Sequence, residues 1–195
     1  MRGRLIVYFH GVPGSSAEID LFQDMAKVHG VRLVAPDRFT FTPDLTGDDY
    51  FHALAMRSEA LLRCVARLQG WLARLAPGLL FQMLFGSAQG EDAGLSRDQG
   101  FQSMIGRVLK SSLGPGLVGY VRDISAYVQP WSHTLAAVSC ETQIWHGDQD
   151  NWSPLGMADA LRALLPDAAS VEVLAGASHY SSLGRAVPRI LAAEN

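Results

Sequence analysis

The stretch LIVYFHGVPGSS, residues 5–16, decides the fold because it joins a short apolar run to a turn and a helix start. Its first half, Leu5 to Phe9, is continuous, β-branched and aromatic, which is typical of a strand buried on both faces of a parallel sheet. Farther along, Ser15 stands three residues before Glu18, the spacing of a capping box at a helix start. We therefore expect a buried strand, a tight turn and a helix that ends at about His29.

A second short strand follows this helix directly. Gly30 has the position of a C-terminal helix cap, Val31 to Ala35 forms the next strand-like run, and Pro36 ends it. Two strands joined by one amphipathic helix form a β-α-β unit, in which the strands pair in parallel.

The C-terminal part of the chain repeats this alternation. Thr142 to Trp145 and Ser170 to Leu174 are strand-like, a helix is expected between them from about Leu155 to Leu165, and a last helix ends near Ala193. The sequence thus predicts a second parallel β-α-β unit.

Between the two units, the apolar residues recur at helical rather than strand spacing. We interpret the whole chain, residues 1–195, as a single α/β domain with a helical cap inserted at about residues 48–129. The helices expected in this region are a long amphipathic one that Pro77 stops, one at about Phe101 to Leu109 and one at about Leu117 to Gln129.

Composition excludes several classes of partner. The formal charge of −3 comes from 16 basic and 19 acidic residues spread along the chain, so no basic stripe is available for nucleic acid. No run approaches the roughly 20 apolar residues of a membrane span, and the run after the basic start of the chain is too short for a signal peptide. Cys64 and Cys140 are interpreted as buried or idle thiols in a reducing compartment. We expect a cytoplasmic protein with a small-molecule substrate and without a membrane partner.

Three loops that follow strand ends resemble the functional loops of the α/β-hydrolase family, in the family's order. The resemblance covers about Leu5 to Phe41 and about Leu117 to Leu191. The loops are His10-Gly11-Val12-Pro13-Gly14-Ser15, His146-Gly147-Asp148-Gln149-Asp150 and Gly176-Ala177-Ser178-His179.

The resemblance implies a role for each loop. In the family, the backbone N–H that follows the His-Gly pair of this loop points at a developing oxyanion, which assigns Gly11 and Val12 to that task. Asp150 takes the place of the catalytic acid and His179 that of the catalytic histidine, with the acid setting the tautomer of the imidazole. Neither a cofactor nor a metal ion is expected.

The family's nucleophile motif is missing from this sequence. Family members carry Gly-x-Ser-x-Gly after a further strand, but that motif occurs nowhere in the chain, and residues 43–47 lead almost directly into the cap. The resemblance therefore implies a fold without two central strands. The remaining four strands would form a shortened, doubly wound, mostly parallel sheet in the order 2-1-3-4.

Three serines are candidates for a substitute nucleophile. Without two strands, Ser15 and Ser16 would lie nearer to His179 by roughly 10 Å, at about 4.8 Å per strand. Ser87, in Gly86-Ser87-Ala88-Gln89-Gly90, resembles an elbow whose serine comes one position early. Simpler interpretations are a helix cap for Ser15 and a loop residue for Ser87.

The other polar and aromatic residues near these loops have plainer interpretations. Asp148 is expected to be a turn residue, and His146 to brace its loop by a hydrogen bond. Trp145, Trp152 and Tyr180 either line a pocket or belong to the core.

Three functions remain open at this stage. The first is a hydrolase of small esters or acyl compounds that keeps the Asp150 and His179 pair without the usual serine. The second is a cofactor-independent cyclase, lyase or isomerase that uses the same pair for proton transfer. The third is an inactive, shortened homologue that acts as a binding module, and a homodimer is left open as well.

Overall fold

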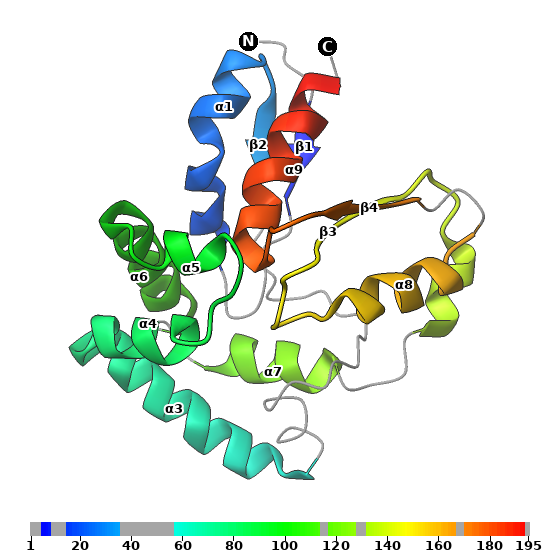
Figure 1. Ribbon diagram of the computed structural model, residues 1–195. Coiled ribbons are helices and arrows are strands. Elements are labelled where there is room, and N and C mark those ends of the chain that lie inside the picture. Colours follow the sequence, from blue (N-terminus) through cyan, green and yellow to red (C-terminus); the bar gives the residue numbers. More distant parts are fainter. Residues whose placement is uncertain are drawn as a thin grey trace.

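The computed structural model describes residues 5–8, 15–35, 57–113, 117–127, 132–166 and 170–193. Figure 1 shows one β-α-β unit, a group of helices and a second β-α-β unit along the chain. The elements are β1 (Leu5–Val7), η1 (Ser16–Leu21), α1 (Gln23–Val28), β2 (Arg32–Val34), α3 (Glu59–Leu75), α4 (Pro77–Phe85), α5 (Asp92–Leu95), α6 (Gln99–Leu113), α7 (Val118–Tyr127), η2 (Ser132–Ala137), β3 (Gln143–Gly147), α8 (Leu155–Leu164), β4 (Ser170–Leu174) and α9 (His179–Ala193). Among these elements, no helix is both long and apolar enough to cross a lipid bilayer.

The first unit pairs β1 with β2 in parallel, as predicted, with Ile6 opposite Leu33. The predicted cap at Gly30 is also confirmed, because its N–H donates to the Lys27 carbonyl and the next N–H, of Val31, donates to the Ala26 carbonyl. This pair of bonds is a Schellman motif, which closes the end of α1.

The start of this helical segment differs from the predicted capping box. The Ser15 hydroxyl accepts from the N–H of Ala17, and a 3-10 turn, η1, precedes α1. Glu18 is 2% exposed, and its carboxylate accepts a 2.8 Å hydrogen bond from the Tyr8 hydroxyl. A buried carboxylate needs a donor, and Tyr8, the residue directly after β1, supplies one, so the Glu18 side chain is held by a hydrogen bond from Tyr8.

The four strands do not form the single sheet that the sequence predicted. In the described part of the chain, β1 pairs only with β2 and β3 only with β4, giving two separate two-stranded sheets. The prediction that β1 is buried on both faces is also wrong, since Leu5 and Val7 are about half exposed. Strands of three residues in a two-stranded sheet lack the neighbours that would cover them.

The second unit is close to prediction. β3 and β4 pair in parallel with Trp145 opposite Glu172, and α8 connects them. Arg189 of α9 forms an ion pair with Glu172, and its guanidinium lies 5.6 Å from the centre of the Trp145 ring. Trp145 thus packs beneath α9 as a structural residue.

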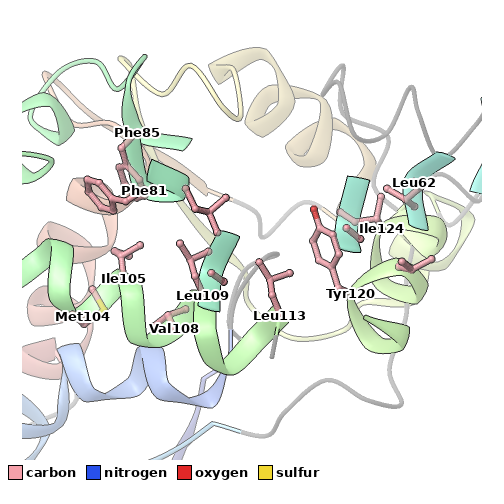
Figure 2. Close-up of a cluster of buried hydrophobic side chains, with 14 residues drawn as sticks. Leu62, Phe81, Phe85, Met104, Ile105, Val108, Leu109, Leu113, Tyr120 and Ile124 are labelled. Carbon is pink, nitrogen blue, oxygen red and sulfur yellow. The ribbon is translucent and has the colours of Figure 1, made fainter. Parts of the chain in front are cut away.

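The main hydrophobic core lies within the helical region α3 to α7, the part interpreted from the sequence as a cap. Figure 2 shows Phe81 and Phe85 of α4 near Ile105 and Leu109 of α6. The buried cluster also includes Leu62, Ala66, Ala73, Leu80, Met104, Val108, Leu113, Tyr120, Val121 and Ile124. The main buried cluster of the described residues therefore lies among the helices and not in either sheet, and we call it the helical core.

Helix α4 was not predicted from the sequence. Pro77 follows the end of α3, as expected, but it also occupies the first turn of α4. Proline suits that position because its fixed φ is helical and its missing N–H would have no partner there. The start of the predicted cap, residues 48–56, lies outside the described residues.

Both thiols are free and exposed, so of the two interpretations, buried or idle, the first is wrong. Cys64 lies on the side of α3 away from Leu62 and Ala66, which are fully buried.

We expect Ile105→Ala to lower the free energy of unfolding by about 2–5 kcal/mol, because it leaves a cavity in the helical core. Ile105 is 1% exposed, whereas Leu68 on α3 is 58% exposed and provides the control. Urea unfolding followed by far-UV circular dichroism measures both variants, and Leu68→Ala should change the value by less than about 0.5 kcal/mol. Equal losses in the two variants would contradict the location of the core.

Candidate active site

Asp150 lies in the loop that follows β3. Its Oδ1 atom accepts hydrogen bonds of 2.9 Å from the N–H groups of Trp152 and Ser153. These bonds fix the carboxylate within its own loop and direct Oδ2 elsewhere. The side chain is only 6% exposed.

His179 is the first residue of α9, shortly after the end of β4. Its Nδ1 atom lies 2.9 Å from Oδ2 of Asp150, although the two residues are 29 positions apart in the sequence. An ionised carboxylate only accepts hydrogen bonds, so the proton of this bond belongs to Nδ1 and a neutral ring has its free lone pair on Nε2. Within the residues that the structure describes, Nε2 makes no hydrogen bond.

The two side chains differ in exposure in a way that suits acid-base chemistry. The imidazole of His179 is 37% exposed, whereas the carboxylate that orients it is buried. A reactant can therefore reach the ring while the carboxylate stays away from bulk water.

Opposing effects act on the pKa of the Asp150 carboxyl. Burial raises the pKa. The hydrogen bond to His179, the charge of His179 and the N–H groups of Ser153 and Trp152 lower the pKa, and their combined effect is larger than that of burial. The pKa therefore lies below its ordinary value, and the ionised form that orients His179 is favoured.

The loop after β3, which carries Asp150, and the loop after β4, which carries His179, touch along their backbones. We call them the acid loop and the histidine loop. The N–H of Gln149 donates to the Ala177 carbonyl at 3.0 Å, and Asp148 accepts a 2.8 Å hydrogen bond from the N–H of Gly176. A Cβ on Gly147 would lie 2.3 Å from the Ala177 oxygen, so only glycine permits this approach. Asp148 is a turn residue, as predicted, and it also joins the two loops.

His146 forms the kind of bond expected of it, since its Nδ1 atom lies 2.9 Å from the carbonyl oxygen of Gly147. Its ring therefore braces the end of β3.

Aromatic rings surround one side of the imidazole. The ring centres of Trp152 and Tyr180 lie 5.1 and 5.7 Å from that of His179, and Phe85 packs against both rings. Trp152 and Tyr180 are partly buried against the helical core. Each of them therefore belongs to the core and also lies beside the imidazole. Burial raises the pKa of the Tyr180 hydroxyl, and the carboxylates of Glu18 and Asp92 raise it further, so that the phenol stays neutral.

The contacts that the structure gives for Ser15 and Ser87 are with residues other than His179. Ser15 is buried and caps η1, and Ser87 is exposed, with its carbonyl accepting from the Asn151 side chain. In the described part of the chain, neither of these two hydroxyls forms a hydrogen bond with the imidazole, and Ser16 is the first residue of η1. The predicted oxyanion residues, Gly11 and Val12, lie outside the described residues.

Sequence reasoning missed Asp92, a buried carboxylate from α5. Its two oxygens accept hydrogen bonds of 2.8 and 2.7 Å from the N–H groups of Tyr180 and Ser181, directly after His179. The only signal near Asp92 is a short polar stretch in a glycine-bearing connection, which does not identify a partner 88 positions away.

Compared by sequence, the chain matches no protein-family model and none of the curated proteins. Compared by structure, it is similar to a bromoperoxidase from Bacillus anthracis, with a TM-score of 0.64 and 13% identity over 98% of this chain and 91% of that one. It is also similar to an esterase from Exiguobacterium antarcticum, with a TM-score of 0.61 and 11% identity over 98% and 91% of the two chains. An α/β-hydrolase-fold protein from Nakamurella multipartita gives a TM-score of 0.59 and 13% identity over 99% and 93%.

The chain has an α/β-hydrolase fold. This confirms the fold class predicted from the sequence, in a shortened form with small parallel sheets. Within this α/β-hydrolase fold, Asp150 and His179 are hydrogen-bonded to each other, and their catalytic roles stay predictions.

Gly147→Ala should destabilise the protein by about 1–3 kcal/mol, because the new methyl group overlaps the Ala177 carbonyl. Gly156→Ala is the matched control, since a Cβ there meets nothing within 4 Å. Thermal unfolding by differential scanning calorimetry compares the two variants. An unchanged melting temperature in Gly147→Ala would contradict the close approach of the two loops.

Acid should remove the stabilisation that comes from ionised Asp150. Because its pKa is lowered on folding, this contribution is complete above the unfolded value of about 4 and is lost as the pH falls through the folded value. Between about pH 5 and pH 2, the free energy of unfolding of the parent protein should fall more steeply than that of Asp150→Asn. Urea titrations across this range test the difference, and parallel curves would refute it.

Proposed function

We propose that this α/β-hydrolase-fold protein is an enzyme that hydrolyses small esters or related acyl compounds, with His179 as the general base and Asp150 as the carboxylate that orients it. The observation that carries this proposal is the 2.9 Å hydrogen bond from Nδ1 of the exposed imidazole to the buried carboxylate. Such a pair holds one tautomer and stabilises the imidazolium that forms when Nε2 accepts a proton.

The base is free to activate water. Nε2 of His179 would take a proton from a water molecule while the water oxygen attacks the acyl carbon, forming a tetrahedral oxyanion. When the carbon–oxygen bond to the leaving group breaks, the imidazolium would return the proton to the departing alkoxide, giving an acid and an alcohol. Asp150 stays ionised throughout and balances the transient charge on the ring.

The surroundings of the imidazole and the comparison by structure support an acyl substrate. The rings of Trp152 and Tyr180 provide an apolar surface beside the imidazole, suited to the carbon chain of a small ester. In the proposed enzyme, the N–H groups of Gly11 and Val12 would donate to the oxyanion. Esterase is the activity named for the protein of similar structure from Exiguobacterium antarcticum.

A serine nucleophile is not required by this scheme, and Ser15, Ser16 and Ser87 remain candidates only. The same hydrogen bond between His179 and Asp150, which leaves Nε2 free to move a proton, also supports a second candidate function. In that alternative, His179 and Asp150 transfer protons in a cofactor-independent cyclase, lyase or isomerase, and no acyl-enzyme forms.

Hydrolysis of p-nitrophenyl acetate and butyrate tests the proposed function. His179→Gln should lower kcat/KM by about 10²- to 10⁴-fold, the usual contribution of a general base. His133→Gln is the matched control, because His133 is exposed on η2 and should keep full activity. A folded parent protein without ester turnover, or equal rates in the two variants, would exclude a hydrolase that works through His179.

The intact mass after incubation with a fluorophosphonate probe separates the two hydrolytic routes. A single adduct that peptide mapping places on a serine would establish a covalent serine route. Ester turnover without an adduct would establish the water route. If there is neither turnover nor adduct, the proton-transfer enzyme or the inactive binding module replaces the hydrolase.

A further inference from the structure

The segment from Ser87 to Asp92 joins the helical region to both loops of the candidate site. The side-chain amide of Asn151, next to Asp150 in the acid loop, donates to the Ser87 carbonyl at 3.0 Å. On the other side, the N–H of Glu91 donates to the carbonyl of Gly176 in the histidine loop at 3.0 Å. One short segment therefore touches the supports of both members of the proposed pair.

Asp92 makes the most specific of these contacts. Asp92 is 2% exposed, and each carboxylate oxygen accepts one N–H from the first turn of α9, namely those of Tyr180 and Ser181. N–H groups at a helix start have no partner within the helix, and a carboxylate there is also favoured by the helix dipole. Asp92 thus caps α9 from a different element of the fold.

The first turn of α9 carries a second cap of its own. The Ser181 hydroxyl accepts from the N–H of Ser178 at 2.7 Å. This local bond does not involve the helical region, so it holds the turn together without fixing the turn in space. Asp92 fixes the turn in space, and His179 is the residue at its beginning.

We propose that Asp92 is a positioning residue for His179, which keeps the imidazole in register with Asp150. A shift of about 1 Å in a catalytic group costs about 10²-fold in rate, so the two hydrogen bonds to Tyr180 and Ser181 decide whether the pair is productive. The kinetic consequence rests on the proposed function, whereas the geometric one does not.

Gly90 shows how closely the segment from Ser87 to Asp92 approaches the acid loop and the histidine loop. Its φ of +52° is unfavourable for other residues, and a Cβ there would lie 2.5 Å from the Gly176 oxygen and 2.8 Å from Cβ of Gln149. Gly90→Ala should therefore push the segment away from both loops without altering the Asp92 carboxylate. It is a second, independent variant for the same idea.

Proton NMR of the histidine ring tests the proposal directly. A ring N–H that donates to a carboxylate gives a low-field resonance, which nitrogen-15 labelling of histidine and the His179→Gln variant assign. Asp92→Ala and Gly90→Ala should lose or strongly shift this resonance, and Asp92→Asn, which keeps one acceptor oxygen, should give a smaller change.

Asp98→Ala is the matched control. Asp98 also accepts a backbone N–H at a helix start, that of Phe101 at 2.7 Å, but it is exposed and caps α6. This variant should keep the His179 resonance. An unchanged resonance in folded Asp92→Ala would overturn the proposal, and if that variant does not fold, an unchanged resonance in both Asp92→Asn and Gly90→Ala would do the same.

Steady-state kinetics add a readout that a purely structural role would not move. Asp92→Ala should lower kcat for p-nitrophenyl butyrate by about 10²-fold with little change in KM, because the bound ester meets a misaligned base. Asp98→Ala should keep the parent kcat. A parent protein that turns over no ester would defeat the proposed function, but the NMR comparison would still decide the role of Asp92.

Discussion

The buried carboxylate of Asp150 is the constraint around which the two C-terminal loops are arranged. A buried charge is stable only with enough donors, and this one accepts from Trp152 and Ser153 in its own loop and from His179 in the next. The third donor requires the ends of β3 and β4 to be adjacent and their loops to touch. The glycine at position 147 and the bond from Gly176 to Asp148 follow from that requirement.

The helical region contributes more than a cover to this arrangement. The described strands form two small sheets, and the main apolar cluster lies among α3, α4, α6 and α7. Trp152 and Tyr180 pack against that cluster beside the imidazole, and Asp92 of α5 caps the start of α9. The geometry of the site therefore depends on helices that are distant in sequence from both loops.

The exposure of His179 and the burial of Asp150 bear on the reactions that this site can catalyse. An imidazole that is one-third exposed and backed by a buried carboxylate has the features of a general base, while the sequence has no Gly-x-Ser-x-Gly motif. Hydrolysis by activated water and proton transfer without hydrolysis both use such a base. In hydrolysis an activated water attacks the substrate, whereas in the alternative only protons are transferred. The Asp150 and His179 pair has the same role in both.

The sequence by itself determined the local features of this protein. Short apolar runs gave the strands, Gly30 and Pro77 marked helix ends, and three loops in a fixed order gave the fold class and the pair of candidate residues. These features are local because periodicity and capping depend on residues a few positions apart. Only the tertiary structure decided that the described strands form two sheets, that Glu18 accepts a hydrogen bond from Tyr8, and that Asp92 caps a helix 88 positions away. Those outcomes depend on which distant elements pack together, because a buried carboxylate accepts hydrogen bonds from the donors that packing places beside it.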